Sequence, residues 1–135
     1  MNQIPEHVQA LLDEETARWS RAGYHVRYEP SFPVSTFTEL PNWGDAPWGE
    51  DPAPRTKADW AETRRWLAEY TGEDPLYYPL LCDAYAANPH ALPPVVVAFH
   101  SDGLYHVNDG NHRVSCAVER GLSHIPAILA EEIAQ

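Results

Sequence analysis

Residues 109–113, Asp-Gly-Asn-His-Arg, combine side chains that together could bind an anion. Gly110 can adopt a positive φ and lets a ligand oxygen approach the backbone closely. If a helix begins just after it, the first backbone N–H groups have no partner inside the helix, and the helix dipole adds partial positive charge there. His112 and Arg113 would lie in the first turn, and an arginine can bind two oxygens of one phosphate. The segment therefore predicts a phosphate site.

The cations in this first turn are the most informative feature of the segment. A first turn normally favours acidic residues, so His112 and Arg113 are locally unfavourable unless an anion is bound there. A simpler interpretation stays open, in which Asp109 or Asn111 only caps the helix. Gly110 would then only form the turn, and Arg113 would pair with a surface carboxylate.

The pattern around this segment predicts a strand, a second strand, a helix and a last strand. Apolar, β-branched residues favour a buried strand, and an Asp-Gly pair indicates a hairpin turn. The predicted elements are a strand over 95–99, a turn at 101–103, a strand over 104–108, a turn at 109–110, a helix over 111–120 and a strand over 124–129.

Three helices are predicted before this region. Within residues 1–27, apolar side chains recur at helical spacing up to Gly23. Thr56 and Asp59 resemble a capping box, which predicts a helix from there to about residue 70. A third helix is predicted over 75–87. Its expected inner face consists of Leu76, Leu80, Leu81, Ala84 and Tyr85.

Residues 28–55 form an arm rich in proline and aromatic residues, which forbids a long helix. Linkers rarely hold so many large aromatics, so we expect an ordered, irregular segment with a short strand at 34–40. The arm is either a structural cover of the core or a lid over a base or substrate. A protein partner could also bind its tryptophans, Trp43 and Trp48.

The composition of the whole chain limits the classes of protein. Its 135 residues suit a single domain, here residues 1–135 with the core over 56–135. The formal net charge of −11 disfavours nucleic-acid binding. We see no apolar run long enough for a membrane span and no secretory signal, so we expect a cytoplasmic protein. Cys82 and Cys116 are then expected to be reduced core residues.

Residues 107–114, together with Ala117 and residues 121–128, resemble the signature of the ParB/sulfiredoxin superfamily. Residues 92–97 resemble the strand that enters this motif in ParB-like domains, and residues 83–88 resemble the end of the preceding helix. The resemblance covers about residues 80–129 and does not extend to residues 1–75.

This resemblance implies a small α+β domain with a mixed sheet that binds a nucleoside triphosphate, ATP or CTP, with magnesium. Carried over to this chain, Gly110, Asn111, His112 and Arg113 would line the phosphates. Asp109 would orient His112 or Arg113, or hold the magnesium ion. If the protein is an enzyme, Asp109 and His112 are the candidate catalytic residues for phosphoryl transfer or hydrolysis.

Departures from the family pattern restrict the function. Sulfiredoxins carry a reactive cysteine where this chain has Asn111, and Cys116 lies more than one turn further on, so sulfinic-acid reduction is not expected. In partition proteins DNA-binding helices follow the domain, whereas this sequence ends at Gln135, so centromere binding and chromosome partition are not expected. The serine kinases of the family need an upstream carboxylate base. Here no motif selects one among Glu29, Glu39, Asp45, Glu50 and Asp51.

Other functions stay open beside a nucleotide-binding enzyme. The chain could be a regulatory module that binds the anion without chemistry, or an acidic protein-interaction factor. A ParB-like nuclease or DNA-associated protein is the third alternative, which the acidic charge disfavours. The residues His100, His106, His112 and Asp109 follow no zinc spacing, so magnesium beside phosphates is the preferred metal.

Overall fold

The computed structural model describes residues 4–42, 53–72 and 77–133. Their elements combine helices with one sheet, as the α+β prediction requires. In chain order they are α1 (Glu6–Ser20), β1 (Tyr24–Pro33), α2 (Thr36–Glu39), α3 (Lys57–Thr71), α4 (Tyr77–Ala87), a short 3-10 helix (Pro89–Ala91), β2 (Val95–Phe99), β3 (Tyr105–Asp109), α5 (Asn111–Glu119) and β4 (His124–Glu132).

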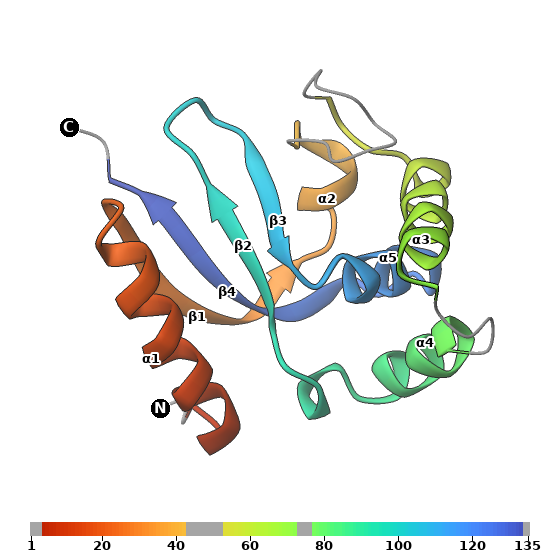
Figure 1. The fold of residues 1–135 in the computed structure, drawn as a ribbon, viewed down its shortest axis with the longest axis horizontal. Coiled ribbons are helices and arrows are strands. Elements are labelled where there is room, and N and C mark those ends of the chain that lie inside the picture. The colour runs from red at the N-terminus through yellow and green to blue at the C-terminus, as the bar shows by residue number, and fades with distance from the viewer. Residues whose placement is uncertain (1–3, 43–52, 73–76, 134–135) are drawn as a thin grey trace.

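The sheet is mixed, and its strand order is β1-β4-β2-β3. β2 and β3 form an antiparallel hairpin, whose turn is closed by the Gly103 N–H donating to the His100 carbonyl oxygen. The chain then passes through α5 and returns as β4, which runs parallel to β2 and antiparallel to β1. This order confirms the predicted hairpin, helix and last strand, and it puts α5 next to the end of β3 (Figure 1).

Both faces of the sheet are covered, because successive side chains of a strand point to opposite faces. Val95 and Val97 of β2 belong to the main core cluster, which also holds buried residues of α3, α4 and α5. On the opposite face, α1 packs against β1 and β4, and its Val8 is buried. Figure 1 shows α1 on one side of the sheet and the other long helices gathered on the other side.

The first part of the proline-rich arm is a strand, which the sequence did not predict. β1 includes residues 28–33 and pairs with β4, with an irregularity between Glu29 and Phe32. An edge strand tolerates prolines because its outer N–H groups need no partner. The strand predicted at 34–40 is wrong, since α2 forms there with Glu39 N–H donating to the Ser35 carbonyl. Phe37 is nevertheless buried, so this part of the arm contributes to the core.

Residues 43–52 and 73–76 lie outside the described residues. The predictions about Trp43 and Trp48, about the arm as a lid, and about the carboxylates Asp45, Glu50 and Asp51 therefore concern residues that the structure does not describe. The same holds for Leu76.

The capping box at the start of α3 is present. The Asp59 N–H donates to the Thr56 hydroxyl at 3.1 Å, and the Thr56 N–H donates to the Asp59 carboxylate at 2.8 Å. These two bonds satisfy backbone groups that the helix itself leaves unpaired. They fix the start of α3 at the predicted place.

The inner face of α4 agrees with the prediction at Tyr85, which is buried, and at Leu81, which packs against the core, and differs from it at Leu80 and Ala84. Tyr78, Cys82 and Tyr85 are buried, whereas the Leu80 side chain is 66% exposed and Ala84 is exposed. The buried residues follow helical spacing with a different phase from the leucines. The side of α4 that faces α5 therefore consists of Tyr78, Cys82 and Tyr85, and Leu80 and Ala84 lie on its outer side.

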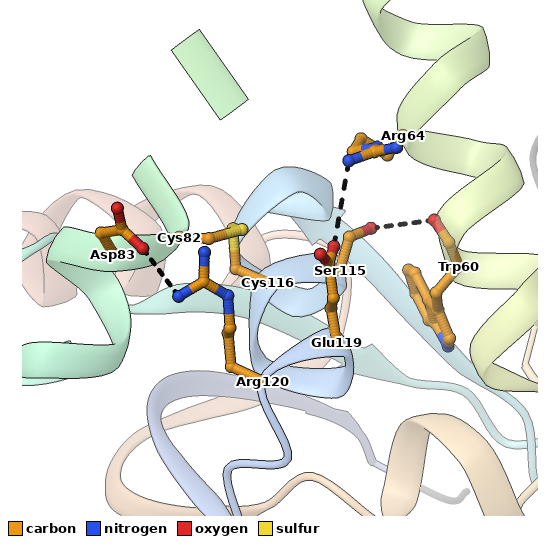
Figure 2. The surroundings of a disulfide bond; sticks show 8 residues. All are labelled: Trp60, Arg64, Cys82, Asp83, Ser115, Cys116, Glu119 and Arg120. Atoms are coloured by element: carbon orange, nitrogen blue, oxygen red, sulfur yellow. Dashed lines mark hydrogen bonds and ion pairs between the residues drawn. A yellow bond between two sulfur atoms is a disulfide. The ribbon is translucent and has the colours of Figure 1, made fainter. Parts of the chain in front are cut away.

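Cys82 and Cys116 are buried, as expected, but they are joined in a disulfide, so the prediction of two reduced thiols is wrong. Their Cα atoms lie 5.0 Å apart because α4 and α5 pack with the two cysteines facing each other. Figure 2 shows the bond between these helices, with the ion pair of Asp83 and Arg120 beside it. The two cysteines are 34 residues apart in the chain, so no local sequence pattern indicates that they meet.

Among the described residues, no helix combines the length and the apolar character that crossing a membrane requires.

Candidate functional site

The strand, glycine turn and helix around residue 110 form as predicted. β3 ends at Asp109, Gly110 adopts a left-handed conformation with φ 102°, and α5 begins at Asn111. A Cβ at Gly110 would lie 2.7 Å from Cγ1 of Val95 and 3.0 Å from Nη2 of Arg113. Glycine is therefore required here both for its backbone angle and for the close packing against β2.

The start of α5 leaves backbone donors available for an anion. Val114 is the first residue whose N–H donates within the helix, to the Gly110 carbonyl oxygen at 2.9 Å. The N–H groups of Asn111, His112 and Arg113 precede this bond and have no acceptor inside the helix. Gly110 has no side chain to cap them, and the first turn contains no acidic residue.

A cavity of about 490 Å³ opens at this helix start. Each of the predicted site residues lines it, so the structure brings the whole set together around one hollow. The lining residues are Leu81, Leu92, Pro93, Asn108, Asp109, Gly110, Asn111, His112 and Arg113.

Four of these lining residues were not predicted as site residues. Leu92 and Pro93 precede β2, and Asn108 lies in β3 beside the predicted turn. Because β2 and β3 are antiparallel, residues before β2 must lie beside the end of β3, so the predicted hairpin could have indicated them. Leu81 comes from α4, and nothing local in the sequence places that helix.

Arg113 is largely buried in the cavity wall. Its side chain is 14% exposed, and its Nη1 atom donates to the Pro93 carbonyl oxygen. Its Nη2 atom lies 3.8 Å from Oδ2 of Asp109, whose side chain is 68% exposed. The contact expected between Asp109 and Arg113 is thus present. This contact agrees with both interpretations: a simple ion pair, and a carboxylate that orients the guanidinium toward a ligand.

Tyr85 lies within electrostatic range of Arg113 and was expected only as a core residue. Burial raises the pKa of the Tyr85 hydroxyl to about 12, and the positive charge of Arg113 opposes part of this rise. The tyrosine ring itself belongs to the main core cluster. The hydroxyl itself has no hydrogen-bond partner among the described residues.

His112 lies between the cavity and α4. Its ring centroid is 6.2 Å from that of Tyr78, and its Nδ1 atom is buried. The structure brings His112 to the cavity, as predicted, and Asp109 pairs with Arg113.

The described residues contain no group of three or more histidine, cysteine or acidic side chains that could hold a metal ion. The His100 and His106 rings are close, with centroids 6.3 Å apart, but they do not assemble with His112 and Asp109. Asp109 is the one carboxylate among the described residues that line the cavity. A single carboxylate suits a magnesium ion that takes its other ligands from phosphates and water.

A second hollow of about 410 Å³ lies between the start of α2 and the end of α5. Among the described residues, its lining includes hydroxyl groups and His124 but no arginine or lysine, so it offers an anion less than the first cavity does. Its lining residues are Pro33, Val34, Ser35, Thr38, Val118, Gly121, Leu122, Ser123 and His124.

No protein-family model matches this chain, and no curated protein sequence matches it either.

Proposed function

We propose that this chain binds a nucleoside triphosphate, ATP or CTP, with its phosphates at the first turn of α5. The observation that carries this proposal is the cavity of about 490 Å³, which has the first turn of α5 and Arg113 in its wall. Cavities for small ligands usually range from about 300 to 1,000 Å³. The resemblance of residues 107–128 to the ParB/sulfiredoxin signature supports the same ligand class.

The two kinds of wall in this cavity suit the two parts of a nucleotide. Leu81, Leu92 and Pro93 offer apolar surface for a base or a ribose. The N–H groups of the first turn and the guanidinium of Arg113 offer donors and positive charge for phosphate oxygens. Nε2 of His112 would add a contact from the side of α4.

The chemistry of the site would follow from the charge that the phosphates carry. Arg113 and the first-turn N–H groups would stabilise negative charge on a transferred phosphoryl group. Asp109 would orient Arg113 and provide the protein ligand of a magnesium ion, which would neutralise charge between the phosphates. His112 would bind phosphate or hold a proton at Nε2.

Binding without turnover is the second candidate, and one observation favours it. Asp109 is the one carboxylate of the described cavity lining, and it already pairs with Arg113. A kinase of this kind needs a carboxylate to accept the proton of the attacking hydroxyl. A regulatory module in the cytoplasm that senses a nucleotide would need none.

Calorimetric titration with ATP, CTP and GTP in the presence of magnesium tests the proposal. We expect binding of at least one nucleotide, and a loss of affinity of about tenfold or more in Arg113→Ala, because a charge-assisted hydrogen bond contributes roughly 1.5–3 kcal/mol. Arg120→Ala is the matched control, since Arg120 lies at the opposite end of α5 and pairs with Asp83. Absence of binding of every nucleotide at millimolar concentration would refute the proposal.

A further inference from the structure

The disulfide joins the two helices that line the cavity. Cys116 belongs to α5, whose first turn contributes Asn111, His112 and Arg113 to the lining. Cys82 belongs to α4 and directly follows Leu81, which lines the same cavity. The bond, which Figure 2 shows between α4 and α5, therefore links the helix on the phosphate side of the cavity to the helix that carries one of its apolar walls.

Residues that follow α4 in the chain belong to the same wall of the cavity. α4 leads through the 3-10 helix Pro89–Ala91 to Leu92 and Pro93, which also line the cavity. The Pro93 carbonyl oxygen is the acceptor for Nη1 of Arg113. A displacement of α4 would therefore move the apolar wall and also the group that holds Arg113 in place.

Apart from the disulfide, α4 is held by the burial of Tyr78 and Tyr85 in the main core cluster, while its polar contacts are weak. Its ion pair to α5, Asp83 to Arg120 at 2.7 Å, joins side chains that are 65% and 35% exposed, and such pairs contribute little. The Tyr85 hydroxyl is buried without a hydrogen-bond partner, which opposes the packing of this helix. The outer face of α4 is exposed at Leu80.

α5, in contrast, is held in the centre of the domain. Its residues Val114, Cys116 and Ala117 are buried, and the Ser115 hydroxyl donates to the Trp60 carbonyl oxygen of α3 at 3.3 Å. If the disulfide were opened, α4 would be the helix that moves and α5 the helix that stays.

We propose that the Cys82–Cys116 disulfide is a redox switch of the cavity. In the oxidised protein the bond holds α4 and the wall up to Pro93 against α5, and in the reduced protein this wall loosens and nucleotide affinity falls. The switch rests on the proposed function, because the nucleotide is the ligand whose affinity it controls. A disulfide in the cytoplasm is usually transient, so both forms would occur there.

The reductant would be a cellular dithiol. One of its thiolates attacks a cysteine sulfur, breaks the Cys82–Cys116 bond and forms a mixed disulfide. Its second thiolate then displaces the protein sulfur, so that two protein thiols and one reductant disulfide result, with transfer of two electrons and two protons. Both cysteine sulfurs lie in buried residues, so α4 must open locally before the first attack. A bound nucleotide would oppose this opening and, by linkage, slow the reduction.

The test compares nucleotide binding by oxidised and fully reduced protein, with MgATP and MgCTP as probes in calorimetry. We expect the reduced protein to bind about tenfold more weakly or worse. Hydrogen exchange should accelerate more over residues 77–93 than in α3, because global destabilisation affects both segments and local opening of α4 affects only the first. Cys82→Ser/Cys116→Ser should bind like the reduced protein under both conditions. Asp83→Asn, which loses the ion pair and keeps the disulfide, should still respond to reductant.

The outcomes separate the switch from the proposed function. Equal affinity of the two redox forms would overturn the switch and leave nucleotide binding intact. No binding in either form would overturn the proposed function and the switch with it. A reduced protein without native circular dichroism would also overturn the switch, because the disulfide would then hold the whole fold and not one wall.

Discussion

Reduction of the Cys82–Cys116 bond should lower the free energy of unfolding of the whole domain by an amount that depends on the length of the loop that the bond closes. The bond closes a loop with a sequence separation of 34 residues. Cross-linking a loop of this length removes conformational entropy from the unfolded chain, which corresponds to about 3.8 kcal/mol near room temperature. This is a large share of the roughly 5–15 kcal/mol that stabilises a typical domain, but it leaves the reduced protein folded.

Thermal unfolding followed by circular dichroism measures this effect. An unfolding entropy of about 2.1 cal/mol/K per residue converts the loss into a fall of Tm by about 13 °C for a chain of this length. The oxidised and reduced proteins should be compared in the same buffer, with the thiol content measured after denaturation.

Asp83→Asn is the control, because it removes only the partly exposed ion pair beside the bond. Its free energy of unfolding should change by about 1 kcal/mol or less. A fall of Tm by less than about 4 °C on full reduction would refute the loop argument, since that corresponds to roughly 1 kcal/mol. It would mean that the unfolded chain is already restricted without the bond, or that the native packing around the sulfurs relaxes on reduction.

Two further predictions concern the glycine turn at residue 110 and the loss of stability at low pH. Gly110→Ala should lower the free energy of unfolding by about 2–4 kcal/mol in urea titration, because it combines a strained φ with a Cβ 2.7 Å from Val95. Gly121→Ala, where no atom lies within 4 Å, should lose only about 1 kcal/mol; equal losses would contradict the packing argument. The Ser101 N–H holds the pKa of Glu132 below its usual value. This hydrogen bond stabilises the fold above the unfolded-state pKa of Glu132, and the stabilisation disappears as the pH falls through the folded-state pKa. In Glu132→Gln the Tm should therefore fall less steeply as the pH is lowered. If the dependence of Tm on pH is the same in Glu132→Gln as in the unmodified protein, Glu132 does not stabilise the fold in this way.

Features that depend on a few neighbouring residues could be predicted from the sequence. The capping box needs only Thr56 and Asp59 at the right spacing, and both of its hydrogen bonds are present. The turn at Gly110 needs only a strand before it and a helix after it. For the same reason, the residues expected to line the phosphates do surround one cavity.

Features that depend on distant parts of the chain could not be predicted. β1 is a strand despite its prolines because β4, far along the chain, provides the partner for Tyr28 and Phe32. The disulfide and the buried face of α4 depend on how α4 meets α5, which no local pattern reveals. Cys82 lies on the buried stripe with Tyr78 and Tyr85, whereas periodicity alone favoured the leucines.

An amide NMR titration with MgATP and MgCTP tests the claim that the first turn of α5 binds the phosphates of a nucleotide. We expect the largest shifts at the N–H groups of Asn111, His112 and Arg113, with smaller shifts at Leu81 and Leu92 across the cavity. Shifts concentrated at Ser35, Thr38 and Ser123, around the second hollow, or no shifts at millimolar nucleotide, would contradict the claim.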